Sequence, residues 1–217
     1  MAAEGQGRFP LLPPQVPQVR SLWRRVVGVV GLGLAGWRID GTYPPLQKFV
    51  IVVAPHTSNW DFPVAMLLKS AMGIEVKFWA KDSLFTMPVF GRWLRWLGAV
   101  PLMRKAASGV VAQMVALIQS KKAESSYFWL ALSPEGTRSY QPGWRSGFYR
   151  VALEAGVPLA LASLDYSKKT LVLRHYMQLS GDTVQDMQDI ALVYEGVRGY
   201  RPGQAAPIQL LEQEKKS

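Results

Sequence analysis

The chain has 217 residues and no cysteine. Disulfides, thiolate metal sites and a cysteine nucleophile are therefore excluded, and the composition fits a reducing compartment. Histidine is almost as scarce, because His56 and His175 are the only two, which excludes a metal site built from several histidines. A G-x-S-x-G sequence is also missing, which argues against a serine hydrolase. Proton transfer near neutral pH therefore has few candidates, and His56 is the better placed of the two histidines.

Long apolar runs are missing as well. The run Val26–Trp37 has 12 residues, whereas a membrane-spanning helix needs about 20. Three arginines precede this run and one follows it. A signal peptide has a similar order, but the long proline-rich arm upstream argues against it. We expect residues 20–45 to form a helical segment in the membrane interface, held by arginine and tryptophan side chains. An ordinary buried helix is the alternative.

The two ends differ in composition from the rest of the chain. Residues 1–19 are rich in proline, glycine and glutamine without an apolar period, so we expect a mobile arm. The polar end, residues 212–217, is expected to fray. Residues 46–211 suit one domain with a single core. The net charge of +10 indicates an anionic partner, and nucleic acid, a membrane surface and a phosphorylated substrate all fit that charge.

Short apolar segments alternate with helical periodicities along this domain. Strands are predicted at 49–54, 75–80, 98–104, 127–132, 157–163 and 170–176, and helices at 62–72, 84–97, 107–120, 145–154 and 182–194. This alternation predicts a single α/β domain with a central mixed sheet flanked by helices, preceded by the interfacial helical segment.

One motif in the apolar run is misleading. Residues 31–36 satisfy G-x-G-x-x-G and follow Val26–Val30, which could be a strand. A dinucleotide site needs a helix directly after the glycines and an acidic residue about 20 positions further on. Gly41 and two following prolines would interrupt such a helix, and the segment around residue 53 carries no acid. We therefore reject a dinucleotide site.

His56 and Asp61 flank a strand-to-helix turn. The apolar strand stops at Pro55, which places His56 at its tip and Asp61 at the start of the next helix. Such a turn can fold the carboxylate back onto the imidazole, and an imidazole that donates to a carboxylate is prepared as a general base. Asp61 also fits a capping box with Ser58, or the N-cap position itself. Both interpretations stay open on this stretch alone.

The stretch between Ser83 and Ala123 contains no acidic residue but six basic ones. Its aromatic and basic side chains suit anionic lipid headgroups, each basic residue contributing about 1 kcal/mol near the surface. The alternative places Trp93 and Trp96 in the core, with the charges on a solvated face.

A sharp turn after the strand ending at Leu132 groups Thr137, Arg138 and Ser139. Hydroxyl groups beside a guanidinium suit a phosphate ligand. A surface loop held by a pair between Glu135 and Arg138 is the alternative.

Four sequence stretches follow one another along the chain in the order His56–Asp61, Gly98–Arg104, Pro134–Ser139 and Val157–Pro158. Together they resemble the glycerolipid acyltransferases of the lysophosphatidic acid acyltransferase type. The first motif of that family is His-x4-Asp and its third is Phe-Pro-Glu-Gly-Thr-Arg-Ser. The first and third motifs are specific together, whereas the second and fourth are weak alone. The resemblance extends over about half of the chain, from residue 49 to residue 164.

The resemblance implies roles for individual residues. His56 would be the general base and Asp61 its orienting carboxylate. The residues implied to hold the polar, usually phosphate, head of the acceptor are Arg104, Glu135, Gly136, Thr137 and Arg138. The fourth motif, Val157 and Pro158, would help to shape the acyl-chain site. The donor would be acyl-CoA or acyl-carrier protein, with no metal, no other cofactor and no acyl-enzyme.

Two positions depart from the family pattern. Ser133 stands where the third motif usually has phenylalanine, and Leu161 stands where the fourth has a second proline. Both departures concern acyl-chain selectivity more than catalysis. Backbone N–H groups near Ser58 are candidate donors to the oxyanion.

We therefore expect a membrane-associated acyltransferase on the cytoplasmic face. Its acceptor would be a lysolipid, most directly 1-acyl-glycerol-3-phosphate, and nucleic acid would not be a partner. Two alternatives remain: a different acceptor such as lyso-ornithine lipid, or a non-catalytic basic domain that binds membranes or nucleic acid.

Overall fold

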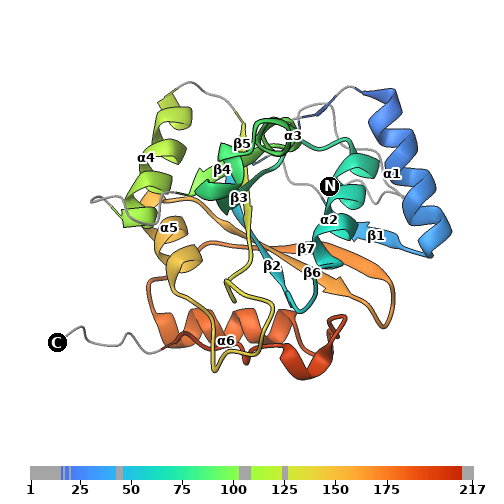
Figure 1. Cartoon of the computed structure of the whole chain (residues 1–217). Coiled ribbons are helices and arrows are strands. Elements are labelled where there is room, and N and C mark those ends of the chain that lie inside the picture. Colours follow the sequence, from blue (N-terminus) through green and yellow to red (C-terminus); the bar gives the residue numbers. More distant parts are fainter. Residues whose placement is uncertain are drawn as a thin grey trace.

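The central sheet has seven strands in the order β1-β7-β6-β2-β5-β3-β4, in a computed structural model of the chain (Figure 1). The structure describes residues 16, 18–19, 21–42, 46–102, 109–123 and 127–211. Most of the expected arm, all of the expected tail 212–217 and the candidate Arg104 lie outside these residues. Within them, the predicted α/β class is confirmed.

Every neighbouring pair of strands is parallel except β6 and β7, so the sheet is mixed, as predicted. The strands are β1 (Arg38–Gly41), β2 (Lys48–Ala54), β3 (Lys77–Lys81), β4 (Ala99–Leu102), β5 (Phe128–Leu132), β6 (Leu159–Asp165) and β7 (Thr170–Met177). Strand β2 lies in the middle and is apolar on both faces, as expected of a parallel strand covered by helices on both sides.

Helices cover both faces of this sheet (Figure 1). Alternate residues of β2 face opposite cores: Val50 and Val52 belong to one, Phe49 and Ile51 to the other. The first core is covered by α4 (Gly109–Ala123), α5 (Gly147–Ala155) and α6 (Thr183–Val193), and the second by α1 (Leu22–Ala35) and α2 (Asp61–Met72). A smaller core beneath α3 (Pro88–Leu97) includes Phe85, Leu94 and Ala99.

The helix predicted over 84–97 is two helices. A short 3-10 helix, Asp82–Thr86, precedes α3, which begins at Pro88. Proline lacks an N–H group and is tolerated in the first turn of a helix but not in its interior, so the chain starts a new helix there.

The N-terminal region is part of the packed domain. Val16 is buried and Gln18 forms a bridge to Ile74, so this end of the expected mobile arm is packed. Residues 26–30, considered above as a strand, lie within α1, which is consistent with the rejection of a dinucleotide site. Strand β1 pairs with β7 and was not predicted, because four residues at a sheet edge carry little periodic signal.

Helix α1 packs on α2 through Gly28. A Cβ atom at this position would lie 2.3 Å from the backbone nitrogen of Ala71 and 2.7 Å from the carbonyl oxygen of Leu67. Backbone atoms cannot move aside as a flexible side chain can, so only glycine allows this approach. The buried side chains Leu32 and Leu68 depend on the same contact between the two helices.

Gly28→Val is expected to force the helices apart and to lower the free energy of unfolding by about 2–3 kcal/mol, measured by urea denaturation. Gly33→Ala is the matched control in the same helix, because nothing lies within 4 Å of its added Cβ atom. That variant should be neutral or more stable by up to about 1 kcal/mol. Equal losses in the two variants would contradict the close contact.

Candidate active site

His56 stands at the carboxyl edge of the sheet, just beyond the end of β2. The strand ends at Ala54, and Pro55 then removes a backbone donor, so the chain leaves the sheet. The His56 side chain is 22% exposed. Its backbone N–H donates to Glu135 Oε2 over 2.5 Å. The imidazole is thus held on a fixed backbone while part of its ring meets solvent.

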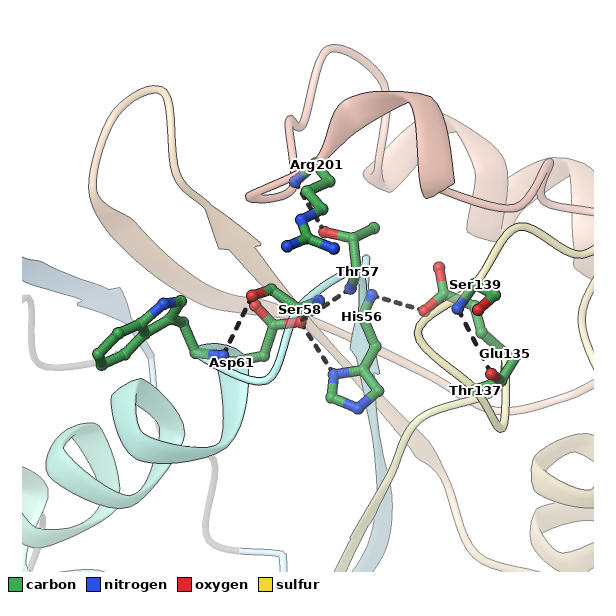
Figure 2. A network of polar contacts seen from close by, with 9 residues as sticks. His56, Thr57, Ser58, Asp61, Glu135, Thr137, Ser139 and Arg201 are labelled. Atoms are coloured by element: carbon green, nitrogen blue, oxygen red, sulfur yellow. Dashed lines mark hydrogen bonds and ion pairs between the residues drawn. The ribbon is translucent and has the colours of Figure 1, made fainter.

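His56 and Asp61 meet across the turn, as Figure 2 shows. His56 Nδ1 lies 3.0 Å from Asp61 Oδ2, and the carboxylate is only 2% exposed. The predicted contact is therefore confirmed. Since Nδ1–H donates to the carboxylate, the second ring nitrogen, Nε2, is the basic one. It has no hydrogen bond to any residue that the structure describes.

The same oxygen of Asp61 also accepts the N–H groups of Thr57 and Ser58, each over 2.8 Å. The backbone-satisfying interpretation and the imidazole-orienting interpretation of Asp61 therefore hold together. Asp61 is not the N-cap of α2, because Trp60 takes that position. The N–H groups of Thr57 and Ser58 donate to the carboxylate and that of Trp60 donates to Ser58 Oγ, so these three are already engaged and do not serve as the expected oxyanion donors.

Asp61 is ionised at neutral pH. Burial by itself raises the pKa of this carboxyl, but hydrogen bonds from His56 and from the Ser58 N–H outweigh it and hold the pKa below its usual value. A negative charge is therefore fixed beside Nδ1, where it can stabilise an imidazolium.

Glu135 makes a different contact from the one expected. It was predicted to hold the acceptor head, but its carboxylate is 2% exposed and anchors the backbone of His56. Burial raises the pKa of Glu135. A buried carboxylate is a poor phosphate ligand, because like charges repel and burial adds a desolvation cost. The alternative pair with Arg138 is also absent, since no ion pair joins these two described residues.

The turn that carries Glu135 contacts residues 55–60, which we call the His56 loop. Arg138 in this turn is exposed. Gly136 has a φ of 67°, and its missing Cβ would lie 2.8 Å from Arg145 Nε. Arg145 therefore lies over this turn, a position that the sequence did not indicate. The Thr137 hydroxyl accepts the N–H of Ser139 over 3.4 Å (Figure 2). Three of the four predicted residues of this turn, Gly136, Thr137 and Arg138, are thus near the site and not buried.

A C-terminal segment closes against the back of the loop. The Arg201 N–H donates to Thr57 Oγ1 over 3.1 Å (Figure 2). At Gly199 an added Cβ would lie 2.7 Å from the same oxygen. The Gln204 amide, with its nitrogen turned toward them, donates to the carbonyls of Arg138 and Thr57. No local pattern predicted this contact, which depends on the chain returning after α6.

Val157 and Pro158 are not brought to His56. They precede β6, whose register pairs Leu159 with Val50 and Ser163 with Ala54. Because β2 and β6 are parallel, the residues that precede β6 lie at the amino ends of the two strands, whereas His56 follows the carboxyl end of β2. The predicted role of this pair in shaping the acyl-chain site stays a prediction.

Positive charge remains uncompensated around the site. Four exposed arginines form no ion pair with any residue that the structure describes: Arg138, Arg145, Arg198 and Arg201. They come from two separated segments, the turn after β5 and the return after α6. Both segments contact the His56 loop, through Glu135 and Arg201, and we call the four arginines that they carry the cationic rim.

Comparisons with known proteins identify a family and a fold for the chain. A family model described as Acyltransferase matches residues 38–162. The 1-acyl-sn-glycerol-3-phosphate acyltransferase of Streptococcus pneumoniae (strain ATCC BAA-255 / R6) is 32% identical over 127 residues, which are 55% of this chain and 45% of that protein. The chain therefore matches less than half the length of this curated relative.

The fold also has a solved counterpart. The crystal structure of PlsC, the 1-acyl-sn-glycerophosphate (LPA) acyltransferase of Thermotoga maritima, superposes with a TM-score of 0.52 over 79% of this chain and 75% of that one. At 17% identity this similarity shows the fold alone. The family model, however, covers more than half of the 217 residues and contains both His56 and Asp61. The chain therefore belongs to the Acyltransferase family.

Proposed function

We propose that the protein transfers a fatty acyl group from an acyl-CoA or acyl-carrier-protein thioester to the hydroxyl of a lysolipid, most directly 1-acyl-glycerol-3-phosphate. The observation that carries this proposal is the contact of 3.0 Å between His56 and Asp61, beside a turn whose Arg138 forms no ion pair with any residue that the structure describes. The family membership supports acyl transfer, and the activity for which the Streptococcus relative is named supports this acceptor.

The chemistry follows from the state of the imidazole. The acceptor hydroxyl attacks the thioester carbonyl carbon while His56 Nε2 takes its proton. A new C–O bond forms, and the carbonyl oxygen becomes an oxyanion. When that oxygen re-forms its double bond, the C–S bond breaks and the thiolate receives the proton from the imidazolium. Asp61 stabilises the imidazolium throughout and keeps Nε2 as the base.

The cationic rim gives the acceptor head a site. Arg138, Arg145 and Arg201 present guanidinium groups, which bind phosphate with two parallel donors. Gly136 and Thr137 lie in the same turn and would add backbone and hydroxyl contacts. Arg104, which lies outside the described residues, is proposed from the sequence as a further phosphate-binding residue.

The acceptor is tested by initial rates with lysophosphatidic acid and with lyso-ornithine lipid. Arg138→Ala should raise the KM for lysophosphatidic acid roughly 10- to 100-fold, the loss of one charge-assisted contact, with little change in kcat. Arg174→Ala is the control, an exposed arginine on β7 that pairs with Asp40. An unchanged KM would remove Arg138 from the phosphate site. If the enzyme acylates lyso-ornithine lipid but not lysophosphatidic acid, the acceptor is lyso-ornithine lipid.

An apolar surface runs over two helices outside the core. The exposed large apolar residues of α1 are Leu22, Trp23, Val26, Val27, Val30 and Leu34, and those of α3 with the residue before it are Met87, Val89, Phe90, Trp93 and Trp96. Trp93 is 42% and Trp96 59% exposed, so their placement in the core is wrong. The guanidinium of Arg24 stacks over the Trp96 ring at 3.8 Å and joins the two helices. We call this the α1–α3 face.

We propose that the α1–α3 face docks on the anionic surface of the cytoplasmic membrane leaflet. Large apolar patches rimmed by charge mark interaction sites. The rim here is basic, with Arg92 and Arg95 on α3 and Arg25 on α1, which complements anionic headgroups. Among the described residues, no helix is long and apolar enough to cross a bilayer.

Cosedimentation with phosphatidylglycerol vesicles tests this docking. The double variant Trp23→Ser, Leu34→Ser is expected to bind at least roughly tenfold more weakly, because two apolar side chains no longer enter the interface. Val184→Ser, Leu192→Ser on α6 is the matched control, since both side chains are 69% exposed. Equal pelleting of the two variants would refute the assignment. Deleting residues 1–38 is a poorer test, because it removes the buried Trp37.

A further inference from the structure

The two oxygens of the Asp61 carboxylate have unequal surroundings. Oδ2 accepts from the His56 imidazole and from two backbone N–H groups. Oδ1 is buried and has no hydrogen-bond partner among the described residues. A buried carboxylate oxygen without a donor carries a large desolvation cost, so the site requires a donor on this side.

The hydroxyl of Tyr166 is also buried and also lacks a hydrogen-bond partner among the described residues. Tyr166 lies in the turn between β6 and β7. Its N–H donates to the Arg198 carbonyl over 2.8 Å. Its ring meets the Trp37 ring edge-on at 4.9 Å and the Tyr200 ring at 5.3 Å. The side chain is therefore fixed by contacts that do not involve its hydroxyl.

The segment after α6 brings the two unpartnered groups together, because the Arg198 carbonyl accepts the Tyr166 N–H and the Arg201 N–H donates to Thr57, whose own N–H binds Asp61. Burial raises the pKa of the Tyr166 phenol, and the Asp61 carboxylate raises it further. Tyr166 in turn is one of the groups that hold the pKa of Asp61 down against its burial. A phenol donates and a carboxylate accepts, and the hydroxyl hydrogen turns freely about its C–O bond. The Oη–H group is thus available to the one oxygen of Asp61 that lacks a donor.

We infer that Tyr166 is a positioning residue of the His56–Asp61 pair, donating from Oη to Asp61 Oδ1 while Oδ2 holds the imidazole. With donors on both oxygens, the carboxylate plane is fixed and Nδ1 always meets the same atom. Tyr166 acts through Asp61 and does not itself touch substrate. It lies beyond residues 38–162, the stretch that matches the family model. Its effect on turnover rests on the proposed function.

The titratable groups that face this pair come from several elements. Glu135 reaches the His56 backbone from the turn after β5. Tyr200 packs on Tyr166 from the segment after α6. Glu135 is the same in both tyrosine variants described below, and Tyr200→Phe measures the contribution of Tyr200 separately.

Tyr166→Phe removes Oη and keeps the ring contacts. Tyr200→Phe removes the hydroxyl of the adjacent ring and serves as the matched control. In thioester-consumption assays, Tyr166→Phe should lower kcat roughly tenfold, because a loosened imidazole spends less time in the reactive geometry. KM for either substrate should stay within about twofold. Tyr200→Phe should match the wild type in both.

A second readout needs no turnover. The chain has two histidines, so side-chain NMR gives two imidazole titrations, with His175 as the internal reference. In Tyr166→Phe the His56 titration midpoint should move to higher pH, because the carboxylate then shares less of its charge with a donor. His175 should not move, and neither midpoint should move in Tyr200→Phe.

The outcomes separate the two proposals. A lower melting temperature of Tyr166→Phe with an unshifted His56 midpoint would make Tyr166 merely structural and would overturn the inference. Equal shifts in both tyrosine variants would overturn it too. A wild type without transfer activity would refute the proposed function, and the NMR titration would still decide the role of Tyr166.

Discussion

His56→Ala is expected to lower the rate of acyl transfer by at least about 10³-fold, near the upper part of the range for general base catalysis. The reason is the geometry of the ring: Nδ1 is engaged by Asp61, which leaves Nε2 as the basic nitrogen. Without it, the acceptor hydroxyl must attack the thioester while still protonated. The measurement is thiol release from an acyl-CoA with lysophosphatidic acid, under single-turnover conditions.

The other histidine supplies the control. His175 lies on β7 and is exposed, so His175→Ala should retain wild-type activity and stability. Unchanged circular dichroism of both variants would show that the fold is intact. Partial recovery of His56→Ala by added imidazole would assign the loss to the missing base. Turnover of His56→Ala within about tenfold of the wild type would refute a general-base role.

The His56–Asp61 contact could be predicted because it is local. Asp61 follows His56 by only five positions, and a strand that stops at a proline before a helix leaves little freedom between them. The alternation of apolar and helical segments likewise indicated the sheet and its layers. Such predictions depend on periodicity and turn chemistry alone, which the sequence displays directly.

The partners of the His56 loop from distant segments could not be predicted. Glu135 is 79 positions away in sequence and reaches His56 because β2 and β5 are parallel neighbours. The order of motifs along the chain likewise does not show that Val157 lies far from His56, because a residue before a parallel strand lies at the opposite end of the strands from a residue after one. Contact between such segments is fixed by strand order, which no local pattern encodes.

Surface placement was predicted only as a choice between two alternatives. The sequence showed that the region of Trp93 and Trp96 was basic and aromatic, but core and membrane-facing helices share that pattern. The structure selects the exposed alternative. The helix start at Pro88 and the contact of Arg24 with Trp96 orient α3 so that one of its sides is exposed beside α1.

Asp61→Asn is expected to lower kcat by about 10²- to 10⁴-fold while the protein still folds. Asparagine keeps the size of the side chain and one carbonyl acceptor for the donors of Thr57 and Ser58. It removes the charge that stabilises the imidazolium, and its amide can leave the imidazole in the wrong tautomer. Asp61→Ala would instead strand buried N–H groups, at about 1–3 kcal/mol each, and confuse stability with chemistry.

The pH dependence of stability gives this variant a second signature. The pKa of Asp61 is lowered in the folded protein from a model-peptide value of 3.8. Its contribution is thus fully present above that value and is lost as the pH falls through the lower folded pKa, because the unfolded chain then binds more protons. Asp61→Asn should therefore lose less stability than the wild type on acidification, in urea unfolding between about pH 2 and 6.

Asp186→Asn is the control that separates the two roles of the Asp61 charge, which are stabilising the fold and assisting catalysis. Asp186 is also 2% exposed and has a lowered pKa despite its burial, but it lies in α6 and is bound by Tyr149 and Ser180. It should lose acid-dependent stability in the same way and keep full transfer activity. If Asp61→Asn behaves like Asp186→Asn, the carboxylate only holds the backbone of the turn. If it loses turnover as well, the charge beside Nδ1 takes part in the reaction, and the short contact with His56 is catalytic.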